Sequence, residues 1–412
     1  MIDAGVASGR ARRAGCVAFL ALWTALLHPR AALADDAGLG IDGVEIHGFV
    51  SQGVIKTTAN NYLAESERGS FEFSEAGINF THSFTPNFRI GAQLFSRDLG
   101  PIGNYRAQFD WYYLSYRFAD WLGIRAGRTK LPFGLYNDTS DIDVAHVPAL
   151  LPQSVYPAQN RDFLLAQTGA ELFGFVPLGG AGALDYRLYG GTIFFDPPKN
   201  AGTGIDIVNV ETPYLIGGRL LYRAPLPGLT VGGSVQRLRL DVDYDIALEV
   251  YSDWQEEGRL PPEFGGELAL GLPVTLWVAS VEYAGDELLV AAEYTRWHAR
   301  YESEYPNLVP NSTVVSEGFY VMASYHVTPW FTPGVYYAGR YPNVDDRHGR
   351  DAFQHDAAFT VRYDINEHWL FKLESHYMYG TAGLRAELND GKTPAELTKE
   401  WGVFLAKTTA YF

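Results

Sequence analysis

Apolar and polar side chains alternate with a period of two along most of the chain after residue 36. In the segment DAAFTVRYD, one face carries Ala357, Phe359, Val361 and Tyr363, and the other carries Ala358, Thr360 and Arg362. Successive side chains of a β-strand point to opposite faces, so this period indicates strands with one apolar and one mixed face. No apolar run in this part of the chain approaches the roughly 20 residues that a membrane-spanning helix needs. The pattern predicts an all-β protein.

Sixteen such segments can be placed along the chain. They are 45–57, 70–84, 88–98, 105–118, 122–128, 166–176, 183–195, 213–223, 229–243, 274–283, 287–300, 316–327, 331–341, 353–364, 369–379 and 400–412. Short connections such as TPN, AGD and TPW alternate with mostly long ones, which reach 129–165 and 244–273. We therefore predict a transmembrane antiparallel up-and-down β-barrel of about 16 strands, with short periplasmic turns and long extracellular loops.

Aromatic residues flank the short connections. The pairs are Phe84 and Phe88, Phe118 and Trp121, Trp330 and Phe331, and Tyr363 and Trp369. In a membrane barrel, aromatic rings at these positions form the girdle at the membrane–water interface. The girdle favours a membrane barrel over the alternative, a soluble β-sandwich.

The last segment, EWGVFLAKTTAYF, is expected to pair with the first strand, because a barrel in a membrane must leave no sheet edge unpaired. The segment resembles the terminal strand of bacterial outer-membrane proteins. In those proteins the final aromatic residue, here Phe412, is part of the signal that the outer-membrane insertion machinery reads.

Composition fits this architecture and separates the first 34 residues from the rest. The chain has 26 Tyr, 24 Phe, 9 Trp and 43 Gly but only 3 Met and 1 Cys, which suits strands and turns. Residues 1–34 combine arginines, the apolar run AGCVAFLALWTALL and the small-residue site AALA, and are expected to be a signal peptide. Residues 35–412 are then a single barrel domain without cysteine.

Charge is unevenly distributed over the predicted barrel. Residues 1–34 hold four arginines and one aspartate, so 28 basic and 47 acidic residues remain after them. This acidic excess argues against nucleic acid as a partner. Opposite the apolar strand faces, however, basic side chains outnumber acidic ones. The candidates for pore-lining residues on these faces are Arg125, Arg187, Arg219, Arg237, Arg239, Arg362 and Lys372.

A barrel of this size is too wide for its wall side chains to fill, so an aqueous lumen is expected. A basic lining would favour anions. The alternative is that lumen bases and acids pair across strands and only maintain the barrel shape.

The connection 129–165 is rich in Pro, Leu and Val, unlike a loop that only meets water. Loops this long in compact proteins are usually functional or disordered. We expect it to fold inward, where five charged residues narrow the pore; the alternative is an outer rim against a neighbouring subunit. The five are Asp138, Asp141, Asp143, Arg161 and Asp162.

At the start of this connection, the stretch GRTKLPFG at 127–134 resembles the phosphate-selective O and P type porins. The resemblance implies a sixteen-stranded homotrimer in the outer membrane of a Gram-negative bacterium, embedded in lipid bilayer and lipopolysaccharide. It also implies anion selectivity, with Arg128 and Lys130 at the junction of strand and loop. Unlike the family's lysine-rich constriction, the loop after Lys130 has aspartates and no lysine.

The predicted function is that of a porin, a water-filled channel for passive diffusion of small hydrophilic solutes, with a preference for anions as the expected selectivity. One alternative is a structural or adhesive barrel with a blocked lumen. A barrel hydrolase is the other, although the histidines are scattered without a serine motif, so we expect no enzyme activity. No cofactor and no metal site is predicted.

Overall fold

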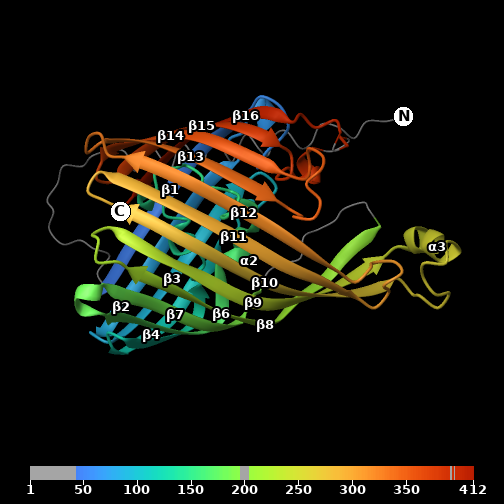
Figure 1. Cartoon of the computed structure of the whole chain (residues 1–412), viewed down its shortest axis with the longest axis horizontal. Coiled ribbons are helices and arrows are strands. Elements are labelled where there is room, and N and C mark those ends of the chain that lie inside the picture. The colour runs from blue at the N-terminus through green and yellow to red at the C-terminus, as the bar shows by residue number, and fades with distance from the viewer. Residues whose placement is uncertain (1–42, 195–203, 390–391, 394) are drawn as a thin grey trace. The chain divides into compact units, whose positions relative to one another are not determined.

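A computed structural model describes residues 43–194, 204–389, 392, 393 and 395–412 of the chain (Figure 1). The predicted signal peptide, residues 1–34, lies outside the described residues. The sixteen strands are β1 (Val44–Thr57), β2 (Phe73–Thr85), β3 (Phe88–Leu99), β4 (Gln108–Ala119), β5 (Leu122–Lys130), β6 (Ala166–Pro177), β7 (Ala183–Thr192), β8 (Ile205–Arg223), β9 (Leu229–Ile246), β10 (Glu267–Ala284), β11 (Leu288–Ser303), β12 (Ser312–Tyr325), β13 (Phe331–Tyr341), β14 (Gln354–Asn366), β15 (Trp369–Gly380) and β16 (Glu400–Tyr411).

These strands form one closed antiparallel barrel in which each strand pairs with its neighbours in sequence. The ring closes between β1 and β16, whose register runs from Phe49 opposite Tyr411 to Thr57 opposite Val403. Figure 1 shows the strands side by side, with the blue β1 beside the red β16 end of the sheet. The backbone of Phe412 adds to this closure, because its N–H donates to the carbonyl oxygen of Gly48 and its own carbonyl accepts from the Gly48 N–H. The predicted fold class and closure are confirmed.

The two faces of the wall differ as the alternation predicts. On β15, Leu373 and Tyr377 are 41% and 55% exposed on the outside, whereas Lys372 and Glu374, on either side of Leu373, are buried on the inside. Outward-facing aromatic rings also cluster at the short turns: Phe84 stacks on Phe88. An apolar exterior with aromatic rings at its rim is the surface that a bilayer requires.

Strands β8, β9 and β10 are longer than the sequence predicts. β8 begins at Ile205, β9 continues to Ile246 and β10 begins at Glu267, so the predicted connection 244–273 is wrong in its extent. The remaining connection contains helix α3 (Leu248–Glu256), which Figure 1 shows at the end of this extension. Ile246, Leu260, Phe264, Leu268 and Leu270 form a small hydrophobic core there.

Helical structure is otherwise short. It comprises α2 (Arg161–Leu164) and the 3-10 turns Ser66–Arg68, Asn137–Thr139, Asp143–Ala145, Ala158–Asn160, Gly179–Ala181 and Ala386–Leu388. None of the helices within the described residues is long and apolar enough to cross a membrane.

Candidate pore and its inward loop

Residues 131–165, here called the inward loop, fold into the barrel. The side chains of Phe133, Tyr136, Leu151, Val155 and Tyr156 pack in one hydrophobic cluster with residues of β10 to β14. Those wall residues belong to the inner face: Tyr320 is buried, whereas its neighbour Val321 is 55% exposed. The loop is rich in apolar residues because it meets protein on the inside of the barrel. The prediction that this connection folds inward is therefore confirmed.

Gly134 allows the loop to turn at its start. Its φ of +58° lies in the left-handed region, and a Cβ atom there would lie 2.4 Å from the hydroxyl oxygen of Tyr156. That hydroxyl accepts hydrogen bonds from the backbone N–H groups of Leu135 and Tyr136, at 2.9 and 3.0 Å. The glycine in GRTKLPFG is thus needed for the chain reversal and for the tyrosine that fastens it.

Two buried carboxylates on the wall fasten the loop. Glu293 on β11 accepts hydrogen bonds from the Leu135 N–H at 2.9 Å and from the Tyr156 hydroxyl. Glu374 on β15 accepts from the Ala149 N–H at 2.8 Å. Burial raises the pKa of the Tyr156 hydroxyl, and so does the nearby Glu293 carboxylate, so the phenol stays protonated and can donate. The loop is held at both ends of its course.

The first of three charged groups on the inner wall joins β5, β6, β7 and β8 to the loop. The Arg125 guanidinium lies 3.0 Å from Glu171, and Arg187 lies 3.9 Å from the same carboxylate. Arg187 and Arg219 lie 3.2 and 3.0 Å from the loop carboxylate of Asp138. Three guanidinium groups therefore share two carboxylates. We call this set the three-arginine group.

The second group lies around Asp141. Its carboxylate is 2.5 Å from the Lys130 ammonium and 3.4 Å from Arg161, and Arg161 binds Asp110 on β4 through two hydrogen bonds of 2.8 and 2.7 Å. Burial alone would raise the pKa of Asp141, but Lys130 and Arg161 outweigh it and hold that pKa well below its usual range. Asp110 also holds Arg128, whose Nε donates to its backbone carbonyl at 2.8 Å.

The third group lies around Asp143. This carboxylate is 2.9 Å from Lys407 and 3.9 Å from Lys372, and Lys407 is also 2.7 Å from Glu75. Despite burial, Lys407 and Lys372 hold the pKa of Asp143 below its usual range. Two ammonium groups and two carboxylates thus balance one another between the wall and the loop.

The remaining predicted residues are also placed by the structure. Arg362 pairs with Asp364 at 2.6 Å and donates to the loop carbonyl of Val144 at 2.6 Å. Asp162 lies 3.3 Å from Arg97 on β3. Eleven of the fourteen predicted residues therefore belong to the inward loop or interact with it or with acids of the inner wall. Arg128 binds only the backbone carbonyl of Asp110 and lies opposite Tyr112, which is 43% exposed.

Arg237 and Arg239 do not reach the loop, and the prediction that they line the pore is wrong. The buried side chains of β9 near them are Ser234, Gln236 and Leu238, and Ser234 accepts the Gly134 N–H of the loop. Arg237 and Arg239 alternate with this inner face and lie on the outside of β9. There Arg239 pairs with Asp241 at 2.7 Å and Glu302 at 2.9 Å.

Some of the acidic partners were not among the predicted site residues. Asp110 and Glu171 each hold a predicted cation, and Glu75 holds Lys407, which was not among the predicted site residues either. All three acids lie on the inner face of a strand. The period-two alternation was the available signal for Glu171, which lies next to the outward Leu172. It could not show which cation each acid meets.

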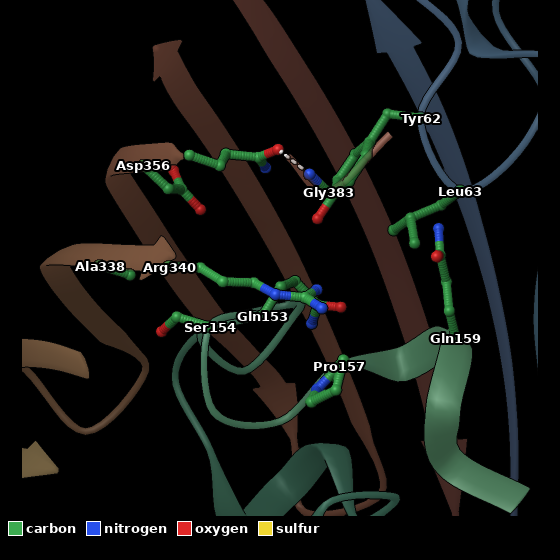
Figure 2. Close-up of a pocket in the computed structure, with 11 residues that line it drawn as sticks. Tyr62, Leu63, Gln153, Ser154, Pro157, Gln159, Ala338, Arg340, Asp356 and Gly383 are labelled. Carbon is green, nitrogen blue, oxygen red and sulfur yellow. Dashed lines mark hydrogen bonds between the residues drawn. The ribbon is translucent and has the colours of Figure 1, made fainter. Parts of the chain in front are cut away.

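Three voids lie along the inward loop. The short-turn cavity, of about 460 Å³, lies between the loop and the walls of β1 to β5, β7 and β16. A middle void of about 70 Å³ is lined by the second and third charged groups. An upper pocket of about 30 Å³ lies near the long loops, and Figure 2 shows Arg340 extending into it toward Gln153.

Each void shares lining residues with the next one. Gln153 and Pro157 line both the upper pocket and the middle void, and Asp143 lines both the middle void and the short-turn cavity. They therefore follow one another along the loop from the long-loop end to the short-turn end. The middle void is bordered by the charged side chains of Asp143, Lys407 and Arg161 and is much smaller than the short-turn cavity.

Comparison with known proteins identifies the fold. No protein-family profile matches the sequence, and no curated protein sequence is similar to it. An anion-selective porin from Comamonas acidovorans has a similar structure, with 12% identity, a TM-score of 0.52, and coverage of 90% of this chain and 99% of the porin. The outer-membrane channel DcaP of Acinetobacter baumannii gives the same four values.

A trimer form of OmpT, an outer-membrane protein of Vibrio cholerae, has 13% identity and a TM-score of 0.50, with coverage of 90% of this chain and 99% of that chain. At these identities the likeness is one of fold. The described residues form a β-barrel of the outer-membrane porin type.

Proposed function

We propose that this protein is a channel in the outer membrane of a Gram-negative bacterium, through which small hydrophilic solutes diffuse passively. The observation that carries the proposal is the series of three voids beside the inward loop, with the middle void as the constriction. Charged and polar groups line that series, so water and ions would meet partners along it. The porin and channel folds that resemble this barrel support the same function.

The proposed selectivity is a modest preference for anions. Among the ion-paired side chains, the group around Asp141 has two cations and two carboxylates, since Arg128 binds only a backbone carbonyl. The group around Asp143 is balanced as well, whereas the three-arginine group has one guanidinium in excess. A fixed positive charge beside the short-turn cavity raises the local concentration of anions. Because Lys130 is paired with Asp141 at 2.5 Å, we propose a general anion preference rather than the phosphate selectivity that GRTKLPFG suggests.

The test is insertion of the purified protein into a planar bilayer. Discrete conductance steps, with a reversal potential in a salt gradient that indicates chloride preference, are the expected result. A cation preference would refute the proposed selectivity and leave the channel intact.

A barrel with a blocked lumen is the second candidate function, and the small size of the upper pocket and middle void favours it. If the loop remains in place at all times, folded protein in bilayers gives no conductance steps. Such a barrel would act by binding partners through its surface loops. The extension around α3 is the candidate binding region.

We also propose a homotrimer, as in the trimer form of the Vibrio protein, delivered to the outer membrane after removal of residues 1–34. Lipopolysaccharide would contact its long-loop end, and the insertion machinery would read the strand that ends at Phe412. Mass measurement of the protein in detergent decides the subunit number.

A further inference from the structure

The short-turn cavity has aromatic rings on one wall. Trp111 and Tyr113, both on β4, line it with ring centroids 5.5 Å apart and planes 20° apart. Both rings occupy the space beside Gly91 on β3, where a Cβ atom would lie 3.0 Å from Tyr113 and 3.1 Å from Trp111. Phe49, which also lines the cavity, lies in the same way over Gly77, at 2.6 Å. Glycines on the neighbouring strands therefore make room for rings that border an open space.

Cations stand next to these rings. The Arg125 guanidinium lies 4.7 Å from the centroid of the Tyr113 ring, and Arg187 shares Glu171 with it. Both arginines belong to the three-arginine group, which has one positive charge in excess. The acids that border the cavity, Asp138 and Asp143, are each held by two cations of the wall. An anionic group beside Tyr113 would thus meet arginine before any free carboxylate.

We propose that the short-turn cavity is a binding site for small aromatic carboxylates. The ring of such a solute stacks on Trp111 and Tyr113, and its carboxylate interacts with Arg125 and Arg187. The volume of about 460 Å³ falls within the range of roughly 300–1,000 Å³ that small-molecule sites occupy. The site deepens the proposed function and rests on it, because diffusion through the channel is what brings a solute to this cavity.

The test compares three probes by saturation-transfer NMR titration of the folded full-length protein in detergent. Benzoate has a ring and a charge, cyclohexanecarboxylate has a saturated ring, and acetate has the charge alone. Benzoate is expected to bind most tightly. Aromatic stacking corresponds to a roughly 2- to 13-fold change in affinity, so Trp111→Leu should weaken benzoate binding by that factor and leave acetate unchanged.

The matched control is Trp121→Leu, which removes an indole that is 58% exposed at a short turn and does not line the cavity. Trp111→Phe keeps a ring and should retain most of the benzoate affinity, which also covers the case in which the leucine variant does not fold. Equal binding of benzoate and cyclohexanecarboxylate, or equal losses in the Trp111 and Trp121 variants, would overturn the proposal.

The binding measurement needs no conduction. Benzoate binding that depends on Trp111 in a protein without conductance supports the site and refutes the channel. Conductance steps in a protein that does not discriminate the probes support the channel and refute the site.

Discussion

Lys407 is the residue through which the proposed constriction can be tested most directly. Its ammonium is buried between Glu75 on β2, at 2.7 Å, and Asp143 of the inward loop, at 2.9 Å. Lys407→Met keeps the length of the side chain and removes the charge. The group around Asp143 then has two carboxylates and one ammonium, so its net charge changes from zero to −1.

Two effects follow, and their sizes differ. Removing one partner of a buried ion pair typically costs about 3–5 kcal/mol, so the loop should separate from β16 more often. In addition, a unit charge about 5 Å from a passing ion changes its energy by ~0.8 kcal/mol even at the dielectric constant of water, which corresponds to about a fourfold change in an equilibrium ratio. We expect the chloride-to-sodium permeability ratio to fall at least fourfold, with larger current fluctuations.

The assay is the reversal potential of single channels in a salt gradient, with Lys56→Met as the control. Lys56 lies on β1, also a wall strand, but is exposed and donates to the backbone carbonyl of Glu67 outside the three voids. A folded Lys407→Met protein with the same reversal potential and the same current fluctuations as the Lys56 variant would refute the constriction at Asp143.

Three further perturbations test how the loop is held. Tyr156→Phe removes a hydroxyl that accepts hydrogen bonds from the Leu135 and Tyr136 N–H groups and donates one to Glu293. We expect the inward loop to bind the barrel wall more weakly by roughly 2–3 kcal/mol and to be cleaved faster by a protease. An unchanged cleavage rate would contradict this. Gly318→Ala places a Cβ atom 2.2 Å from the Ser154 carbonyl oxygen of the loop and should increase current fluctuations. Gly190→Ala should not, because its Cβ atom would lie 3.7 Å from the nearest atoms, which is ordinary van der Waals contact. Equal behaviour of the two variants would show that the contact with Ser154 is unimportant. Burial, with a contribution from Lys372, lowers the pKa of His146 to about 4. Because an undocked histidine titrates near 6.5, docking should be strongest above that pH and weaken as the pH falls toward 4; His146→Asn should flatten this dependence of the current fluctuations between pH 7 and 4.5.

All sixteen strands could be predicted because the two faces of each strand meet different environments. An outward side chain meets hydrocarbon and an inward one meets polar groups or the loop, and this difference imposes a period of two. The ends of β8, β9 and β10 were missed where the chain continues past the barrel wall. There the acidic run from Asp241 resembles a loop, although its apolar partners Val242 and Ile246 are buried.

The same change of environment explains the error at Arg237 and Arg239. Val235 on β9 is 53% exposed on the outside and Leu238 is buried on the inside. Between them the outer face changes from apolar to charged. The rule that the apolar side faces outward is correct for the part of β9 nearer the short turn and reverses beyond it. Alternation gives the two faces of a strand, but only the position relative to the bilayer says which face is polar.

Ion-pair partners could not be predicted, because they depend on where the inward loop lies. Asp138 and Arg187 are 49 positions apart, and Asp143 and Lys407 are 264 apart. No local pattern links residues so distant. The apolar content of the loop predicted that it would leave the solvent, but not which wall it would meet.

The position of the loop changes what the basic wall means for selectivity. Strand alternation alone suggests a lumen lined with uncompensated arginine and lysine. In the folded barrel, Asp138 and Asp143 each reach two of those cations, and Asp141 reaches Lys130 of the wall and Arg161 of the loop. The aspartates that distinguish this loop from a lysine-rich constriction therefore neutralise much of the wall. Among the three charged groups, the excess positive charge belongs to the three-arginine group, beside the cavity and away from the constriction. Any anion preference should therefore arise where solutes can pause beside the aromatic wall, while the passage at Asp143 is close to neutral and responds to the loss of either sign of charge.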